Sequence, residues 1–301
     1  MKKITVIGAN SYIARNLICY LERSGPDVQL FLYDRALLQT DGHSSYTQID
    51  VLSKESVHNI KMNCDIIFMF VGKTGSANGF DDIDTFIDIN QKALLNVLNE
   101  YRHQRSNAKI VFPSTRLVYK GSVVPQKEDS VKEFKTIYAM CKYACENYLQ
   151  QYNSVYGVNY CILRIGVLYG SMINGTSSYG TAEFMLNSAL NKKNISLYGD
   201  GSVRRTVTHI EDLCKIMYEA AVSETCINDV YNVGGEDFSL SEMAQLVAER
   251  FNINVNYIPW PDTELKIESG NTVFSSDKLD SILGLLNSHK FIDWIKTLSS
   301  D

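Results

Sequence analysis

Tyr138 and Lys142 are two residues whose types and spacing could carry out proton transfer. They lie in the segment 136–149, which contains Ala, Met, Leu and Glu but no Gly or Pro and is predicted to be a helix. Residues four apart share one face of a helix, so the phenol and the ammonium should lie side by side. A neighbouring positive charge lowers the pKa of a phenol from its usual value of about 10. Such a phenol can take a proton from an alcohol while a cofactor takes the hydride.

The same spacing can arise by chance, because the chain contains 18 tyrosines. The alternative interpretation is a surface lysine beside a packed tyrosine. A catalytic role for Tyr138 is therefore favoured only if other parts of the chain provide a cofactor site near the same helix.

A candidate phosphate-binding turn follows the first β-rich segment, residues 3–7. The turn begins at Gly8 and leads into an amphipathic helix that extends to about Arg23. A strand, a turn of small residues and a helix N-terminus form a pyrophosphate site, because the backbone approaches the phosphates closely and the helix dipole favours their charge. Ser11 and Ala14 stand where glycine is usual, but both side chains are small. A plain turn between a strand and a helix is the alternative.

Asp34 directly follows the second predicted strand, residues 28–33. A carboxylate at this place can accept hydrogen bonds from the hydroxyls of an adenosine ribose, and it would repel a 2′-phosphate. Asp34 therefore favours NAD as the cofactor. Arg35, the next residue, leaves NADP open, because a guanidinium could bind that phosphate.

Strands and helices alternate along the first half of the chain. Beyond the first two strands, we predict strands at 46–49, 65–71, 109–112 and 159–163, and helices at 54–60, 83–102 and 136–152. This order predicts an α/β fold with a Rossmann-type, doubly wound parallel sheet. Ligands of such sheets bind beyond the C-terminal ends of the strands. The features at such ends are Gly8, Asp34, the loop 72–75 and Thr115. Their placement favours the catalytic interpretation of Tyr138.

The pattern changes from about residue 166, where a smaller C-terminal α/β substrate lobe is predicted. Its elements are a loop rich in Gly and Ser at 169–181, helices at 182–191 and 239–251, and a strand at 195–198. Ser239 and Glu242 form a capping box at the start of the second helix. We predict a dinucleotide-binding Rossmann domain over 1–165, to which 205–235 returns, and a substrate-binding lobe over 166–204 and 236–301.

Composition and charge restrict the classes of function. The net charge of −5 and the pI of about 5.6 argue against a nucleic-acid partner. The longest strongly apolar run, residues 66–71, is too short to cross a membrane, and the N-terminus lacks a signal-peptide cleavage site. The seven cysteines form no CxxC pair, so we expect reduced thiols in a cytoplasmic protein and no metal site.

Together these motifs resemble those of the extended short-chain dehydrogenases/reductases, specifically the NAD-dependent epimerase/dehydratase family, which acts on nucleotide sugars. The order and spacing of the motifs carry the resemblance, which covers most of the chain. The matching positions are 8–14, Asp34, Asp50, Val51, Asn90, Ser114, Thr115, Val118, Tyr119, Tyr138, Lys142, Arg164, 169–170, 199–201, 205–212 and 231–235.

The resemblance implies a role for each matching residue. Tyr138 would be the general acid/base, Lys142 would bind the nicotinamide ribose and lower the pKa of Tyr138, and Thr115 would orient the reacting oxygen. A capping or turn hydroxyl is the alternative for Thr115. The residues implied to hold NAD are Gly8, Ser11, Tyr12, Ile13, Asp34, Arg35, Asp50, Val51, Val71, Gly72 and Lys142. Those implied to contact the nucleotide sugar are Thr115, Arg116, Tyr138 and Arg205.

Arg205 is implied to bind a phosphate of the nucleotide sugar. The alternative is a solvated basic pair of Arg204 and Arg205 on a loop. The resemblance also implies a homodimer, formed through the predicted helices 83–102 and 136–152.

Three departures from the family pattern bear on the reaction. Arg116 and Leu117 replace the Asp-Glu pair with which dehydratases of the family eliminate water, so 4,6-dehydration is not expected. Val167 replaces an Asn, and Thr206 replaces an Asp that usually follows the arginine. Both changes lie near the expected sugar-nucleotide contacts and suggest an unusual sugar or an altered grip on the pyrophosphate.

We therefore expect an NAD-dependent nucleotide-sugar epimerase that acts at C4 through a transient 4-keto sugar. The alternative is a nucleotide-4-keto-6-deoxy-sugar reductase that uses NAD(P)H in the synthesis of surface polysaccharide sugars. A third hypothesis is a non-catalytic regulator that binds a dinucleotide on the same fold. The presence of Thr115, Tyr138 and Lys142 counts against the third.

Overall fold

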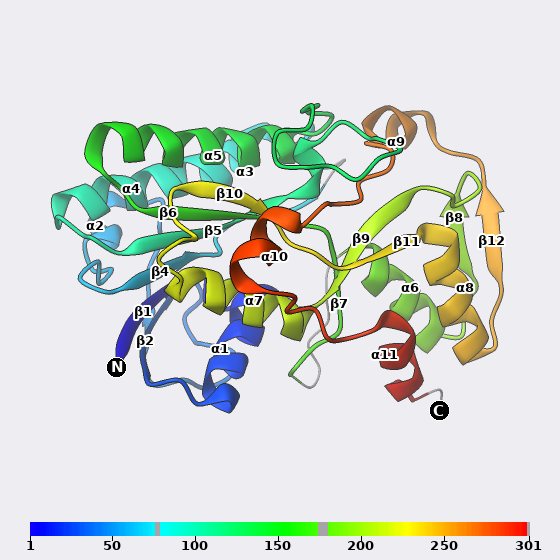
Figure 1. Cartoon of the computed structure of the whole chain (residues 1–301), viewed down its shortest axis with the longest axis horizontal. Helices are drawn as coiled ribbons and strands as arrows, with labels where there is room; N and C mark the ends of the chain where they lie inside the picture. Colours follow the sequence, from blue (N-terminus) through cyan, green and yellow to red (C-terminus); the bar gives the residue numbers. More distant parts are fainter. Residues whose placement is uncertain (76–78, 174–179, 300–301) are drawn as a thin grey trace.

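A seven-stranded parallel sheet forms the larger part of the molecule (Figure 1). The computed structural model describes residues 1–75, 79–173 and 180–299. The order of the strands across the sheet is β10-β6-β5-β4-β1-β2-β3. These strands are β1 (Lys2–Ile7), β2 (Val28–Asp34), β3 (Tyr46–Gln48), β4 (Ile66–Met69), β5 (Lys109–Thr115), β6 (Tyr160–Ile165) and β10 (Asp229–Asn232). The predicted Rossmann-type fold is confirmed.

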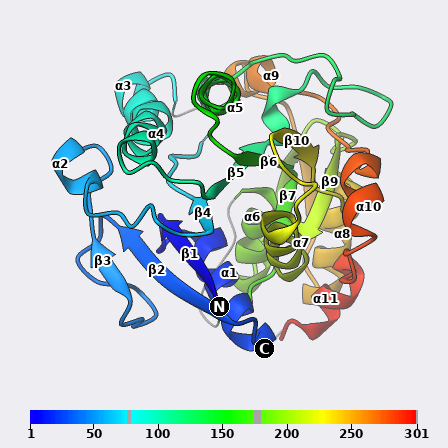
Figure 2. The same ribbon diagram turned by 60° about the vertical axis from the view of Figure 1, so that its left-hand side comes forward.

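Helices cover both faces of this sheet (Figure 2). Helices α1 (Tyr12–Ser24) and α7 (Ile210–Val222) pack on one face and share a core with β1 and β4. Helices α2 (Lys54–Val57), α4 (Ala93–His103) and α5 (Ile137–Tyr156) lie on the other face. All four residues of β4 are buried, as expected for a parallel strand covered on both sides.

The seventh strand was not among the six predicted from the first part of the chain. β10 pairs in parallel with β6, with Val230 opposite Ile162, so the chain returns to the large sheet after a long excursion. β10 lies within residues 205–235, the segment that the sequence predicts to return to the Rossmann domain. The division into two domains stays a prediction.

The predicted helix 83–102 is present and contains a π-helical turn. The structure has α3 (Ile83–Ile87), a π-helical turn (Asp88–Lys92) and then α4. Asn90 lies in the π-turn, and its side-chain amide donates to the Phe86 carbonyl at 2.9 Å and to the Lys73 carbonyl at 3.1 Å. The prediction of a helix over 83–102 is confirmed, but the sequence did not predict its π-helical turn.

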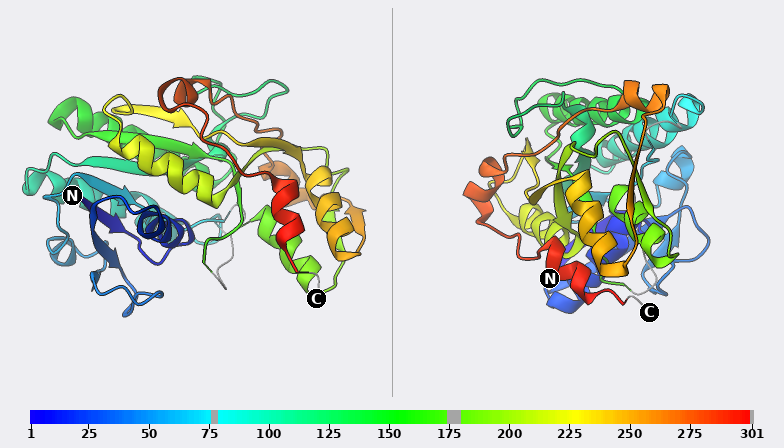
Figure 3. Two further views of the ribbon diagram at one scale, coloured as in Figure 1. Left: turned by 60° about the horizontal axis from the view of Figure 1, so that its bottom comes forward. Right: turned by 90° about the vertical axis from the view of Figure 1, so that its right-hand side faces the viewer.

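The smaller lobe gathers at one end of the large sheet (Figure 3). A three-stranded sheet has the order β11-β9-β7, and β12 pairs with β8. Helices α6, α8 and α11 enclose its apolar core. The elements are β7 (Val167–Tyr169), α6 (Thr181–Leu190), β8 (Ile195–Tyr198), β9 (Arg204–His209), β11 (Glu236–Ser239), α8 (Leu240–Phe251), β12 (Val255–Ile258), α9 (Asp262–Ile267) and α11 (Phe291–Thr297). Helix α10 (Asp277–Leu283) instead packs against β10 and α7.

Local predictions for this lobe can be compared with the structure element by element. The capping box of Ser239 and Glu242 is present at the start of α8. Part of the predicted loop 169–181, residues 174–179, lies outside the described residues. All seven cysteines are free thiols, and five of them are buried. Within the described residues, no helix has both the length and the apolar character needed to cross a bilayer.

Candidate functional site

Tyr138, Lys142 and Thr115 line one cavity of about 340 Å³. The Thr136 side chain caps α5 by accepting a backbone hydrogen bond at 3.1 Å, which places Tyr138 in the first turn and Lys142 one turn later. Lys142 Nζ donates to the Pro113 carbonyl at 2.7 Å, and Thr115 ends the same strand, β5. The structure therefore brings together the three residues that the sequence predicts to be catalytic.

Burial dominates the proton affinities of the two titratable groups in this cavity. It raises the pKa of Tyr138 above the usual 10. It also lowers the pKa of Lys142 from 10.5 to about 8, and Cys145 and Glu146 partly oppose this second shift. The sequence predicts the opposite direction for Tyr138. The difference arises because desolvation disfavours the charged form of both groups.

The turn at Gly8 is built for close approach of a ligand. Gly8 has φ +88°, and a Cβ there would lie 2.8 Å from the Val71 nitrogen, so the backbone at this position has room only for glycine. The Ser11 side chain caps α1 by accepting a hydrogen bond from the Ala14 amide at 3.4 Å. This cap occupies the Ala14 amide, and the binding of a phosphate at the start of α1 stays a prediction.

A second cavity of about 530 Å³ lies over this turn. The predicted cofactor residues that line it are Gly8, Ser11, Asp34, Arg35, Asp50, Val51, Val71 and Gly72. Asp34 accepts hydrogen bonds from the Asn10 amide at 3.0 Å and the Ala36 amide at 3.3 Å, which fix its carboxylate at the end of β2. This geometry suits the ribose hydroxyls of an adenosine.

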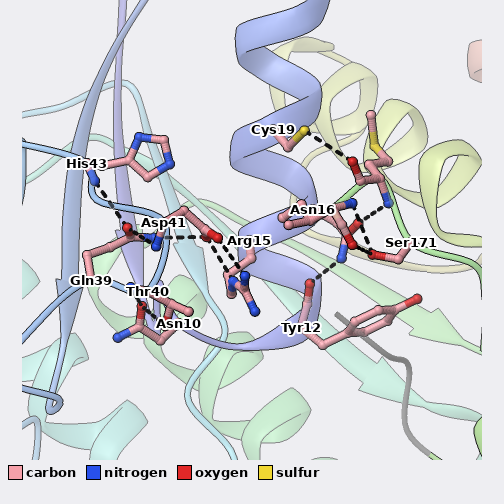
Figure 4. Close-up of polar contacts among 12 residues, drawn as sticks. Asn10, Tyr12, Arg15, Asn16, Cys19, Gln39, Thr40, Asp41, His43 and Ser171 are labelled. Atoms are coloured by element: carbon pink, nitrogen blue, oxygen red, sulfur yellow. Dashed lines mark hydrogen bonds and ion pairs between the residues drawn. The ribbon is translucent and has the colours of Figure 1, made fainter. Parts of the chain in front are cut away.

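The loop after β2 is tied to the start of α1 (Figure 4). Arg15 on α1 donates to the Asp41 carboxylate at 2.8 Å, and the Asn10 side chain accepts from the Thr40 amide at 2.9 Å. These contacts hold the segment that carries Asp34 and Arg35 against the Gly8 turn. The ribose-binding and phosphate-binding groups are thereby fixed relative to each other.

The two cavities adjoin each other, because Ser11, Phe70 and Gly72 line both. Tyr12 and Ile13 line the catalytic one, and the Tyr12 hydroxyl donates to the Gly170 carbonyl at 2.5 Å. An elongated ligand could therefore extend from Asp34 to Tyr138. The residues present fit a dinucleotide with its adenosine at Asp34 and its nicotinamide beside Tyr138 and Lys142.

The two predicted substrate-binding arginines lie in different surroundings. Arg116 lines the catalytic cavity, and its Nη1 donates to Thr272 Oγ1 at 3.0 Å. Arg205 is 2% exposed, does not line this cavity and donates to Glu268 at 2.6 Å. Its role as a phosphate ligand stays a prediction, and it would require this ion pair to open. No motif in the sequence pointed to Glu268.

A buried ion pair behind the catalytic residues was also missed by the sequence analysis. Arg164 on β6 binds the Glu146 carboxylate at 3.0 and 2.6 Å, and Ser114 donates to the same carboxylate. Both charged side chains are at most 4% exposed. Glu146 is one turn after Lys142, so the pair couples α5 to the strands that end at Thr115. The four-residue spacing of Lys142 and Glu146 on one helix was the feature of the sequence that could have pointed to this ion pair.

A family model supports the interpretation of this site. The model described as "NAD dependent epimerase/dehydratase family" matches residues 4–234, which is more than half of the chain. The chain belongs to this family. The epimerase/dehydratase family consists of enzymes, and the motifs that carried the resemblance lie within the matched range or next to it.

Individual proteins of known activity are similar over most of the chain. CDP-paratose 2-epimerase of Salmonella typhi is 24% identical, with 99% of this chain and 96% of that protein covered. The UDP-N-acetyl-alpha-D-glucosaminuronate decarboxylase of Bacillus cytotoxicus is 24% identical, with 81% and 78% covered. The solved UDP-glucose 4-epimerase of Thermus thermophilus, in complex with NAD, has a TM-score of 0.84 at 21% identity, covering 99% of this chain and 100% of that one. At this identity the last comparison shows the fold.

Proposed function

We propose that this protein is an NAD-dependent nucleotide-sugar epimerase that acts at C4 of the sugar. The observation that carries the proposal is the adjacency of the two cavities, one lined by Tyr138, Lys142 and Thr115 and the other by Asp34. The similarity to CDP-paratose 2-epimerase supports a nucleotide-sugar epimerase. Reaction at C4 is supported by a putative UDP-glucose 4-epimerase of Methanocaldococcus jannaschii that is 27% identical over 53% of this chain.

In this mechanism the chain's own residues move a proton and hold the sugar. NAD, when bound, supplies the acceptor and donor of a hydride. Tyr138 takes the proton from the C4 hydroxyl as the 4-keto sugar forms and returns it to the same oxygen when the alcohol is restored. Thr115 Oγ1 accepts a hydrogen bond from the Leu117 amide at 3.2 Å, so its own hydroxyl hydrogen can be donated to the reacting oxygen. An ammonium on Lys142 would favour the phenolate, in opposition to the burial that raises the pKa of Tyr138.

The charge of the cavity wall fits a nucleoside diphosphate sugar. Among the described residues that line the catalytic cavity, Arg116 and Lys142 carry positive charge and none is a carboxylate. A diphosphate would bring compensating negative charge. The missing carboxylates also argue against a dehydratase, because no Asp or Glu follows Thr115 to assist the departure of water.

A 4-keto-6-deoxy-sugar reductase is the second candidate, favoured by one feature of the cavity. Ile165, Val167 and Leu168 form an apolar wall where the family pattern has a polar Asn at position 167. Such a wall could pack against the C6 methyl group of a deoxysugar. Arg35 at the cofactor cavity would permit NADPH.

The nucleotide carried by the purified protein distinguishes the two candidates. The protein is denatured, and the released nucleotide is identified by mass spectrometry. An epimerase regenerates NAD in each turnover, so near-stoichiometric NAD is expected, together with epimerisation of a nucleotide sugar without added cofactor. Release of no nucleotide, with NADPH-dependent reduction of a 4-keto-6-deoxy nucleotide sugar, would instead establish the reductase.

A Tyr138→Phe variant tests the mechanism that both candidates share. It should reduce kcat by about 10²–10⁴-fold, the usual contribution of a general acid/base, and leave NAD affinity within about twofold. Tyr143→Phe, on the next turn of α5, is the matched control and should retain activity, because Tyr143 lies outside the residues that line the catalytic cavity. Full activity of Tyr138→Phe would refute the assigned role.

A further inference from the structure

Two guanidiniums, those of Arg116 and Arg205, lie near a single carboxylate, Glu268. Arg205 forms an ion pair with this carboxylate, donating to Glu268 Oε1 at 2.6 Å. It also donates to the carbonyls of Gly270 at 2.5 Å and Arg204 at 2.9 Å. Glu268 Oε1 also accepts from the Gly270 amide at 2.9 Å. The buried Arg205 is therefore held by one carboxylate and two carbonyls of its own surroundings.

Arg116 has no such partner. Its hydrogen bond goes to the neutral hydroxyl of Thr272, and no described carboxylate forms an ion pair with it. Burial, with a contribution from the charge of Arg205, lowers the pKa of Arg116 to about 9, and Glu268 only partly opposes this. A guanidinium in this position would be stabilised by an anion that both of its amino groups can bind.

The position of Arg116 shows where that anion would lie. It directly follows Thr115 and lines the catalytic cavity, whose described lining contains no carboxylate. A ligand in this cavity can therefore reach Arg116 without disturbing the ion pair of Arg205 and Glu268. Any anionic group that Arg116 binds must come from the ligand.

We infer that Arg116, rather than Arg205, binds an anionic group of the substrate. Glu268 pairs with Arg205, which acts as a positioning residue for the segment around Thr272. This inference rests on the proposed function, because it takes the ligand to be a nucleotide sugar. The anion is an oxyanion suited to a guanidinium fork, and it has two sources in such a ligand: the diphosphate, or a carboxylate on the sugar ring.

Calorimetric titration of the full-length protein tests this assignment. Wild type is first titrated with UDP, CDP, GDP and dTDP, and the base that binds is then used as the free diphosphate, the glucose conjugate and, where it exists, the glucuronate conjugate. Arg116→Gln should raise Kd by about 10- to 100-fold for ligands that carry the recognised anion. Arg204→Gln is the matched control, because Arg204 is bound to Asp237 at 2.8 Å and Glu242 at 3.2 Å, and it should change Kd by less than about twofold.

A double variant separates Arg116 from Arg205. Arg205→Met/Glu268→Gln removes both partners of the ion pair, so no buried charge is left unpaired, and Kd should rise less than about threefold. Thermal melting of each variant establishes that it is folded. An unchanged Kd in Arg116→Gln, or a loss in the double variant as large as that expected for Arg116→Gln, would overturn the inference.

The pattern across ligands identifies the source of the anion. If Arg116→Gln weakens the free diphosphate and both conjugates equally, the diphosphate is bound. If it weakens only the glucuronate conjugate, the sugar carboxylate is bound. If wild type binds NAD but none of the diphosphates or conjugates, the proposed function fails and this inference fails with it. Binding that is unaffected by Arg116→Gln overturns the inference alone.

Discussion

Lys142 is a buried cation, with 6% of its surface exposed and its ammonium bonded to the Pro113 carbonyl at 2.7 Å. The sequence predicts its position beside Tyr138, since both lie on one helix face four residues apart. It does not predict the balance between burial and charge, because burial depends on β5 and the lobe that closes the cavity. In the folded protein this balance depresses the pKa of Lys142 to about 8.

A pH titration of stability should reveal this depressed pKa. Between about pH 8 and 10.5 the unfolded chain holds more protons at Lys142 than the folded chain does. The free energy of unfolding of wild type should therefore rise with pH across this window, relative to that of Lys142→Met, in which the group is absent. Denaturant titrations at several pH values measure the difference, and Lys92→Met on the neighbouring layer of helices controls for the loss of a lysine. A difference that does not vary with pH would contradict the shift.

At the scale of elements, the strands and turns that carry the phosphate site follow from local sequence. The segments 3–7 and 28–33 appear as β1 and β2 within one residue at each end. The local pattern did not predict the π-turn that contains Asn90, whose side chain donates to the Lys73 carbonyl in a loop outside this helix. The strand β10 was likewise hidden, since its pairing partner β6 lies far back in the sequence.

The Gly8 turn allows a prediction with an internal control. Gly8→Ala combines an unfavourable φ of +88° with a contact of 2.8 Å to the Val71 nitrogen, so it should cost about 1–3 kcal/mol of stability and sharply weaken NAD binding. Gly25→Ala shares the positive φ, at +66°, but meets no atom within 4 Å. It should lower stability by about 1 kcal/mol and leave NAD affinity unchanged. Thermal unfolding and NAD titration measure both. Equal NAD affinity of the two variants would contradict the close approach at Gly8.

At the scale of the whole molecule, the cavity is completed by segments that are distant in sequence. The C-terminal ends of β1, β4 and β5 supply the groups that strand-end reasoning predicts, including Thr115. The lobe contributes Val167 and, through Glu268, the ion pair that occupies Arg205. Sequence patterns predict where strands end, but not which side chain of a second lobe reaches a buried arginine. For that reason the sequence predicts Arg205 as the phosphate ligand without indicating its ion pair with Glu268.

An apolar surface formed by α3 and α5 supports the expected homodimer. Ile83 and Ile87 on α3 are 43% and 41% exposed, and Met140 on the adjacent α5 is 52% exposed. Apolar side chains at adjacent positions of two neighbouring helices are typical of a surface that a partner covers. A second copy of the chain that meets this surface with its own α3 and α5 would bury these side chains on both copies.

Light scattering during size-exclusion chromatography should therefore give about twice the 34.0 kDa mass of one chain for wild type. Met140→Glu should shift the mass towards one chain, because association would bury an unpaired carboxylate near the symmetry axis. Leu285→Glu, at a position that is 85% exposed in the segment after α10, is the control and should leave the mass unchanged. NAD binding should survive in both variants, since neither residue lines the cavities. A wild-type mass of one chain at all concentrations tested would show that these helices do not form a dimer interface.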